Sequence, residues 1–226
     1  MNRFVWHVAI NVAILVCSLL TVTALVALGW YSWRPLYEAT HPPALAMSAV
    51  KMQAPMWSGS GVYLGHGFIV TAGHVADGLS SIEIDLSTGA KAQGEVLWTN
   101  TLEGDGYDVA LIYAPDLPAQ SASLSCRQSE VGDHISIVGN PGPLTFLTTW
   151  GRVSGPVSAG QWDRWKSLVA LDIVAAPGVS GGPVYSADGS VVGILVSGLV
   201  IPGRGTYGYS MMVPSTAICR LMGRAP

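Results

Sequence analysis

Two hydrophobic patterns divide the chain, and the first lies at its N-terminus. Between Arg3 and Arg34 there is no Lys, Arg, Asp or Glu, and Val8–Trp30 is a run of 23 mostly apolar residues. A helix of that length spans about 35 Å, which is enough for a hydrocarbon core of about 30 Å. The pattern therefore predicts an N-terminal transmembrane anchor over residues 1–33, with the lipid bilayer as its partner.

A cleaved signal peptide is the alternative interpretation of this run. Hydrophobic regions of signal peptides are about 7–15 residues long, and the small-residue site Ala44–Ala46 lies far downstream. We therefore favour an uncleaved anchor. Arg3 and the terminal amine favour a cytoplasmic N-terminus, with the rest of the chain on the periplasmic or extracellular side. Arg34 and Lys51 weaken this bias.

The second pattern follows a proline-containing tether, predicted over residues 34–54. From Pro55 onward, short runs of β-forming residues alternate with glycine, proline and asparagine turn signals. Gly61–Leu64 and Phe68–Thr71, joined by a loop with two glycines, predict a hairpin. Further strands are predicted over 82–86, 92–98, 109–113, 134–138, 144–148, 151–154, 168–174, 191–196 and 207–213. A short helix is expected from Ser215, as N-cap, to the stop at Gly223.

This arrangement predicts the fold class. Several short strands in each half, without a long helical pattern between them, are typical of two antiparallel β-barrels. We therefore expect an all-β domain over residues 55–226. The first barrel would cover about 55–120, the second about 130–214, and the C-terminal helix about 215–223.

Composition and charge exclude several classes of function. Half of the residues are hydrophobic, so the domain can bury a core. The net charge is −3 with scattered basic residues, which argues against nucleic-acid binding. The three cysteines form no C-x-x-C pair, and there is no H-E-x-x-H motif. We therefore expect neither a metal site nor a cofactor.

Three short segments carry residue types that catalyse hydrolysis through a nucleophile. TAGHV ends a predicted strand with His74, DVALI begins one with Asp108, and GVSGGPV places Ser180 in a glycine-rich turn. A serine hydroxyl is a weak nucleophile and needs an adjacent base. A histidine can take its proton and later give it to the leaving group. A carboxylate on the other ring nitrogen fixes the tautomer, and Asp105 is a second, less favoured candidate for that role.

The glycines beside Ser180 and the order of the three residues along the chain both bear on the mechanism. The backbone N–H groups of Gly178 and Ser180 would bind the oxyanion that develops during acyl transfer. Gly178-x-Ser180-x-Gly182 also matches the G-x-S-x-G elbow of α/β-hydrolases, which requires a histidine after the serine. All five histidines precede Ser180, so that alternative fails. The order His, Asp, Ser is instead that of chymotrypsin.

These segments resemble those of the trypsin-like (chymotrypsin-fold) serine peptidases, and most closely the HtrA/Deg-type branch. TAGHV is similar to the family's catalytic-histidine segment, DVALI to its acid motif, and GVSGGPV to its nucleophile loop. VGDHISIVGNPGPL, VVGILVSG and GYSMMVPSTAICRLM are similar to the start of the second barrel, the substrate-binding strand, and the last strand with the terminal helix. The resemblance covers roughly residues 58–222 and implies two six-stranded barrels with serine peptidase activity.

The chain departs from the family in two places. Val179 stands where chymotrypsin-type zymogens carry the Asp that pairs with a newly cut N-terminus, so we do not expect activation by that route. HtrA-type proteins usually add a C-terminal PDZ domain. Because the chain ends at Pro226, shortly after the predicted helix, we expect no such domain here.

The resemblance also implies a specificity pocket and a disulfide. By position in this fold, Val174 forms the base of the pocket and favours small or medium apolar residues before the cut. The other predicted pocket residues are Val196, Ser197, Gly198 and Ser210. The connection between the barrels, with Cys126, packs near the terminal helix, with Cys219, and some members bridge these elements. Such a bridge would indicate an oxidising compartment.

The sequence therefore predicts a membrane-anchored serine endopeptidase that cleaves proteins or peptides. Ser180 would be the nucleophile, His74 the general base and then acid, and Asp108 the orienting carboxylate. The alternative is a catalytically silent, membrane-tethered module of the same fold that binds peptides. The pattern predicts neither the physiological substrate nor the oligomeric state.

Overall fold

The first structural unit contains a helix. The computed structural model describes residues 12, 14–29, 44–101, 107–157, 168–201 and 205–224. The chain divides into two compact units, Met1–Pro43 and Ala44–Pro226, and in the first of them residues 14–29 are helical. Among the described residues, no helix is long and apolar enough to cross a membrane. The predicted span over Val8–Trp30 is therefore not confirmed, and its two ends lie outside the described residues.

The polar side chains of this helix bond back to its own backbone. The hydroxyls of Ser18, Thr21 and Thr23 each donate to the carbonyl four residues earlier, at 2.8, 2.8 and 3.0 Å. The large apolar side chains around them are exposed. The helix consequently presents an apolar surface on which the few hydroxyls are already satisfied.

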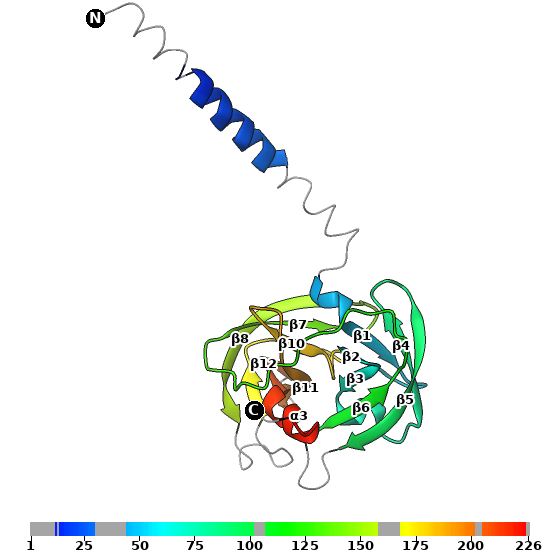
Figure 1. Cartoon of the computed structure of the whole chain (residues 1–226). Helices are drawn as coiled ribbons and strands as arrows, with labels where there is room; N and C mark the ends of the chain where they lie inside the picture. The colour runs from blue at the N-terminus through cyan, green and yellow to red at the C-terminus, as the bar shows by residue number, and fades with distance from the viewer. Residues whose placement is uncertain are drawn as a thin grey trace, which may run out of the picture. The chain divides into compact units, whose positions relative to one another are not determined.

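The second unit contains two closed, six-stranded, antiparallel β-barrels that lie side by side (Figure 1). This confirms the predicted all-β class. The first barrel consists of β1 (Ala49–Gln53), β2 (Ser58–Gly65), β3 (Phe68–Thr71), β4 (Ser81–Leu86), β5 (Lys91–Asn100) and β6 (Val109–Tyr113). The second consists of β7 (His134–Gly139), β8 (Leu147–Val157), β9 (Leu168–Leu171), β10 (Pro183–Ser186), β11 (Val191–Ile201) and β12 (Gly205–Pro214). The short helices are η1 (Ala44–Met47), α2 (Gly73–Ala76) and α3 (Ser215–Leu221).

The local patterns explain the well-predicted strands. β2 and β3 form the expected hairpin, and His66 in its turn has a φ of 54°. In β4 the apolar residues Ile82 and Ile84 are buried in the core, and the acidic ones point outward. Lys91 at the start of β5 lies 2.6 Å from Glu83, and this ion pair lies on the outer side of β4 and β5. Alternation with a period of two thus places one face of each strand in the barrel interior.

The structure corrects several predicted boundaries. β1 lies within the predicted tether, because a strand of five residues with three of them buried shows no clear alternation. The end of the run predicted over 144–148 and the whole run predicted over 151–154 belong to one strand, β8, which begins at Leu147 and continues through Gly151. The strand predicted over 168–174 ends at Leu171, and β10 was not predicted. Short strands that are mostly buried show too little alternation between apolar and polar residues to be detected from the sequence.

Hydrogen bonds and a shared core join the two barrels. The buried Tyr185 on β10 shares a 2.7 Å hydrogen bond with Ser48 and donates to the Leu45 carbonyl at 3.0 Å. Burial raises the pKa of the Tyr185 hydroxyl to about 12. The first barrel's core cluster also includes buried residues of the second barrel, such as Val138 and Ile194.

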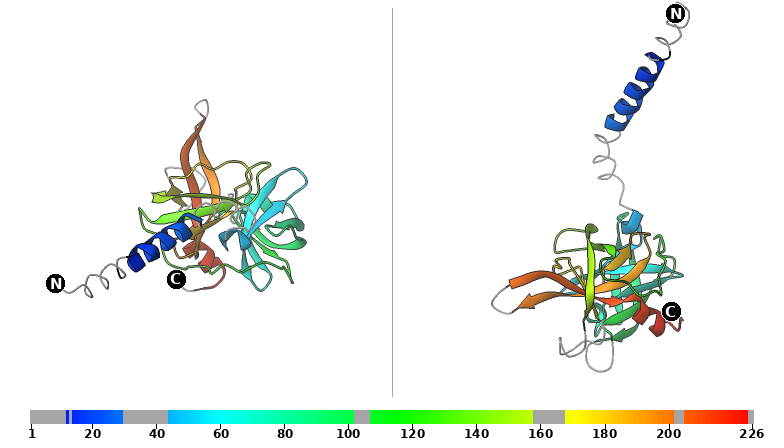
Figure 2. Two further views of the ribbon diagram at one scale, coloured as in Figure 1. Left: turned by 90° about the horizontal axis from the view of Figure 1, so that it is seen from above. Right: turned by 90° about the vertical axis from the view of Figure 1, so that its left-hand side faces the viewer.

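Two further features belong to the second barrel. Figure 2 shows that β11 and β12 form a long hairpin that projects beyond the barrel. Cys126, in the connection between the barrels, is joined to Cys219 of α3 by a disulfide with a Cα–Cα distance of 5.8 Å. The predicted bridge is therefore present, and it fastens the connection to the C-terminal helix.

Candidate active site

A histidine and a buried carboxylate form the centre of the site. β3 pairs with β6 so that Thr71 lies opposite Ala110. This register brings α2, which follows β3, beside the residue that precedes β6. His74 Nδ1 lies 2.6 Å from Asp108 Oδ2, and the His74 backbone N–H donates to Asp108 Oδ1 at 2.8 Å. Both carboxylate oxygens are therefore bonded to the same residue.

The burial of this pair determines its chemistry. The Asp108 side chain is fully buried, whereas 43% of the His74 side chain is exposed. A buried carboxylate is tolerated only when its oxygens are hydrogen-bonded. Because Nδ1 is held by Asp108, Nε2 is the ring nitrogen available for proton transfer. Gly73 is required here, since a Cβ at this position would collide with the carbonyl of Asn100.

The loop with Ser180 meets the His74 segment at the start of β2. The Ser60 backbone N–H donates to the Ser180 carbonyl at 2.7 Å. A Cβ on Gly59 would lie 2.6 Å from the Val75 side chain and 3.2 Å from the Ser180 carbonyl oxygen. The side chain of Val75, which follows His74, and the Ser180 carbonyl oxygen therefore both lie close to Gly59, where there is no room for a side chain. The structure therefore brings together all three segments that carry the predicted triad.

The backbone before Ser180 is oriented by defined contacts. The Pro177 carbonyl accepts a hydrogen bond from the Gly142 N–H at 3.1 Å. Because N–H and C=O point in opposite directions across a trans peptide, the Gly178 N–H faces away from Gly142. Gly178 has a φ of 99°, which favours glycine. Among the described groups, neither the Gly178 N–H nor the Ser180 N–H has a hydrogen-bond acceptor.

A buried polar network, missed from the sequence, supports this loop. The Ser60 hydroxyl donates to the Gly178 carbonyl at 2.8 Å. It also accepts from the backbone N–H and the side-chain amide of Asn140, at 3.0 and 2.9 Å. Both side chains are fully buried. Asn140 lies in the GNPG turn that carried the family resemblance, which was the only sequence signal for its role.

The predicted specificity residues do not all come together. Val196, Ser197 and Gly198 follow one another on β11, and Ser210 on β12 lies opposite Gly198. Val174 is 64% exposed and lines a separate apolar pocket. The next residue, Ala175, lies beside Gly198, since a Cβ on Gly198 would lie 3.2 Å from the Ala175 Cβ. Val174 therefore lines the apolar pocket, whereas Ala175 lies beside β11.

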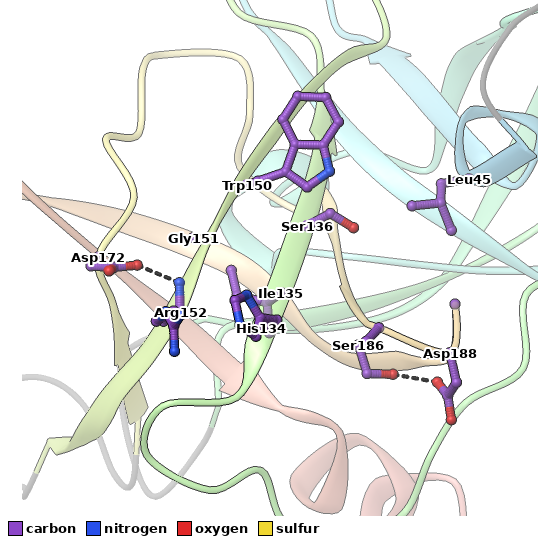
Figure 3. Close-up of a pocket in the computed structure, with 12 residues that line it drawn as sticks. Leu45, His134, Ile135, Ser136, Trp150, Gly151, Arg152, Asp172, Ser186 and Asp188 are labelled. Atoms are coloured by element: carbon purple, nitrogen blue, oxygen red, sulfur yellow. Dashed lines mark hydrogen bonds between the residues drawn. The ribbon is translucent and has the colours of Figure 1, made fainter. Parts of the chain in front are cut away.

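A cavity of about 750 Å³, lined mainly by residues of β7, β8 and the turn after β10, contains none of the predicted site residues (Figure 3). Its two carboxylates are held by neighbouring groups. Asp172 accepts from the Arg152 backbone N–H. The Ser186 hydroxyl, followed by the N–H and hydroxyl of Ser190, lowers the pKa of Asp188 to about 2. These contacts stabilise turns, and we assign them no catalytic role.

Asp105, the second candidate for the triad carboxylate, lies outside the described residues. Across the described part of the chain, no three His, Cys, Asp or Glu side chains gather as metal ligands would.

Comparison with known proteins identifies the family. A family model described as a trypsin-like peptidase domain matches residues 59–194. The chain belongs to this family. The fold and the convergence of the three segments agree with a trypsin-like peptidase domain.

Individual relatives confirm the resemblance to the HtrA/Deg-type branch. The chain is 29% identical over 177 residues to the periplasmic serine endoprotease DegP of Salmonella typhimurium, covering 76% of this chain and 36% of that protein. It is 31% identical over 160 residues to a probable DegP-like periplasmic serine endoprotease of Marinomonas, covering 70% and 33%. The chain thus spans about a third of the length of these relatives.

A solved structure shares the fold. The trypsin-like domain superposes on the HtrA-type protease AlgW, determined with a tripeptide, with a TM-score of 0.69 and 21% identity. The match covers 79% of this chain and 60% of that one.

Proposed function

We propose that this trypsin-like domain is a serine endopeptidase that hydrolyses peptide bonds through Ser180, His74 and Asp108. The contact of 2.6 Å between exposed His74 and buried Asp108, at the place where the Ser180 loop arrives, carries the proposal. The relatives named serine endoproteases support it. No cofactor is required, because serine, histidine and carboxylate supply the nucleophile and the proton transfers.

The reaction follows from this arrangement. His74 Nε2 takes the Ser180 hydroxyl proton while Oγ attacks the substrate carbonyl carbon. The imidazolium, stabilised by Asp108, gives this proton to the leaving amine, the C–N bond breaks, and an ester to Ser180 remains. His74 then takes a proton from water, whose oxygen attacks the ester. Ser180 leaves with the proton from His74, and the carboxylic acid product is released.

The oriented backbone before Ser180 would stabilise the transition state. The two N–H groups of Gly178 and Ser180 are proposed to bind the oxyanion of each tetrahedral intermediate. Donors of this kind contribute roughly 2.7–4 kcal/mol each, because they are fixed before the charge develops. The contacts of Pro177 with Gly142 and of Gly178 with Ser60 support this assignment.

We propose a preference for small or medium apolar residues before the cut. Val196 is buried, Gly198 leaves room on the wall, and Ala175 offers only a methyl group beside it. No basic or acidic side chain among these residues would select a charged substrate. The contribution of Val174 that the sequence suggested is replaced here by that of Ala175.

Peptide hydrolysis distinguishes this enzyme from a silent binding module of the same fold. Full-length protein is incubated with denatured casein, and the products are sequenced by mass spectrometry. We expect new peptide ends after alanine, valine or other small residues, which His74→Ala protein does not produce. Casein that is bound but never cleaved would contradict the proposal and favour the binding module.

We also propose that the N-terminal segment anchors the domain to a membrane, with the peptidase on the periplasmic or extracellular side. The uncharged run over Val8–Trp30 and its internally bonded hydroxyls support this proposal. So do the periplasmic relatives and the disulfide, because disulfides persist in oxidising compartments.

Alkaline extraction of membranes tests the anchor. We expect the wild-type protein to remain in the pellet. Leu19→Lys with Leu20→Lys should release it, since a charge at a helix centre costs about 2.5–3.5 kcal/mol on insertion scales. Leu97→Lys, at an exposed position of β5, is the matched control and should stay in the pellet. Wild-type protein in the soluble fraction would refute the anchor.

A further inference from the structure

The cavity of about 750 Å³ lies on one face of β7 and β8. Ser136 on β7 pairs with Trp150 on β8, and two residues further along these strands His134 pairs with Arg152. Residues directly opposite each other, and residues two apart on one strand, project from the same face of a sheet. Ile135, between the two pairs, belongs to the barrel core, so the other four side chains share the opposite face.

Helix η1 covers only part of this face. Tyr185 on β10 lies opposite Ser136, is fully buried, and donates its hydroxyl to the Leu45 carbonyl at 3.0 Å. Leu45 also lines the cavity. On the other side of Ser136, Trp150 is 74% exposed. A groove is therefore left between Leu45 and Trp150, and Ser136 lies at its floor (Figure 3).

The floor of this groove carries a hydroxyl that the protein itself does not satisfy. Ser136 is only 6% exposed and lines the cavity. Among the described groups, its hydroxyl has no hydrogen-bond partner. Burying a hydroxyl is unfavourable unless it is hydrogen-bonded. A ligand that places a polar group here would gain a hydrogen bond at a position shielded from water.

Both donors and acceptors surround the groove. Oδ1 of Asp172 accepts from the Arg152 backbone N–H, and Oδ1 of Asp188 accepts from the Ser186 hydroxyl at 2.5 Å. Within the described part of the chain, Oδ2 of each carboxylate has no hydrogen-bond donor. The Arg152 guanidinium donates through one nitrogen to the Gly132 carbonyl at 3.3 Å, and its other N–H groups remain available.

Three classes of ligand fit this lining poorly. An anion would meet two carboxylates and one guanidinium, which leaves an excess of negative charge. A wholly apolar ligand would desolvate the Ser136 hydroxyl and the carboxylates without bonding them. A polypeptide cannot add as a further strand, because β7 is already paired on both edges, with β8 and with β10.

A neutral saccharide matches each of these features. Each of its hydroxyls can both donate and accept a hydrogen bond, as the mixed lining requires. The C–H face of a sugar ring is apolar and packs on a flat, exposed indole. The volume lies within the range of about 300–1,000 Å³ that is typical of small-ligand sites. The groove therefore has room for an oligosaccharide.

We propose that the groove between Trp150 and Leu45 binds a neutral oligosaccharide. One sugar ring packs on the Trp150 indole, and a hydroxyl of the sugar bonds to Ser136. Asp172, Asp188 and Arg152 bond the remaining hydroxyls. The site shares no residue with the proposed triad, so it holds or fails independently of peptide hydrolysis.

Isothermal titration calorimetry of the full-length protein tests the site, in a detergent without a sugar headgroup. The probes are maltotriose, cellotriose and N,N′,N″-triacetylchitotriose. Trp150→Ala removes the stacking surface, and Ser136→Ala removes only the hydroxyl. Trp98→Ala and Ser123→Ala are the matched controls, at exposed positions outside the cavity.

We expect at least one trisaccharide to bind the wild-type protein and both controls. Trp150→Ala should weaken its binding at least about tenfold, and Ser136→Ala at least about fivefold. The Tm of Ser136→Ala should stay the same or rise, because the hydroxyl has no partner in the free protein. A merely structural role for Ser136 would instead lower Tm and leave binding intact. Casein cleavage should be unchanged in both variants.

Two results would overturn the proposal. The first is the absence of binding with all three trisaccharides, or binding that both Trp150→Ala and Ser136→Ala retain. The second concerns a basic peptide, for which N-acetyl-trilysine amide is the probe. Binding of this peptide that is lost in Trp150→Ala, without binding of any trisaccharide, would assign the groove to a polypeptide.

Discussion

Replacement of Ser180 by alanine is expected to lower kcat for peptide hydrolysis by roughly 10⁶-fold, as loss of the nucleophile does in other serine peptidases. The methyl group cannot form the acyl-enzyme, and His74 then has no hydroxyl proton to accept. The measurement compares initial rates on a peptide chosen from the casein cleavage sites. Ser123→Ala, at an exposed serine in the connection between the barrels, is the matched control and should retain the wild-type rate.

A Ser180→Ala rate within tenfold of wild type would show that another group is the nucleophile. Circular dichroism guards against misfolding as the cause of a loss. The substitution removes one oxygen from a partly exposed side chain, so the spectrum should not change.

Asp108→Asn is expected to lower kcat by roughly 10⁴-fold at neutral pH. The amide oxygen can still accept from the His74 backbone N–H, which replaces the contact now 2.8 Å long. The amide nitrogen would then donate to Nδ1, where the carboxylate oxygen now lies at 2.6 Å. The ring would carry its proton on Nε2 and could not accept the one from Ser180.

Kinetics of Asp108→Asn and of Asp77→Asn test this reasoning. Asp77 is exposed and lies immediately after α2. The substitution Asp77→Asn therefore removes the same type of charge near His74 without changing a contact of its ring. We expect Asp77→Asn to retain activity within a few-fold of wild type. A loss of less than tenfold in Asp108→Asn, or an equal loss in both variants, would refute the orienting role of Asp108.

The fold was predictable to the extent that strands alternate. In β4, apolar and acidic residues alternate strictly, and the β2–β3 hairpin has its glycines at the turn. β1 and β10 carry no such pattern, since most of their residues are buried on both sides. Their existence depends on pairing with β2 and β11, which is set by the closure of the barrel and not by local sequence.

The candidate site was predictable in its motifs and not in its surroundings. The segments around His74, Asp108 and Ser180 each match a local pattern, and their order excludes the competing hydrolase fold. The bond between Ser60 and Asn140 joins residues 80 positions apart, so no local signal reports it. Ala175, not Val174, lies beside Gly198, because the direction of a side chain in an irregular turn depends on backbone angles that spacing does not fix.

The site of reaction with a fluorophosphonate tests the central claim most directly. These reagents form a covalent bond only with a serine that is activated as a nucleophile. Full-length protein is labelled in detergent beside Ser180→Ala and His74→Ala, and the adduct is located by mass spectrometry. We predict one adduct, on Ser180, in the wild-type protein alone. An adduct on another serine, or no adduct under conditions in which casein is cleaved, would contradict the account.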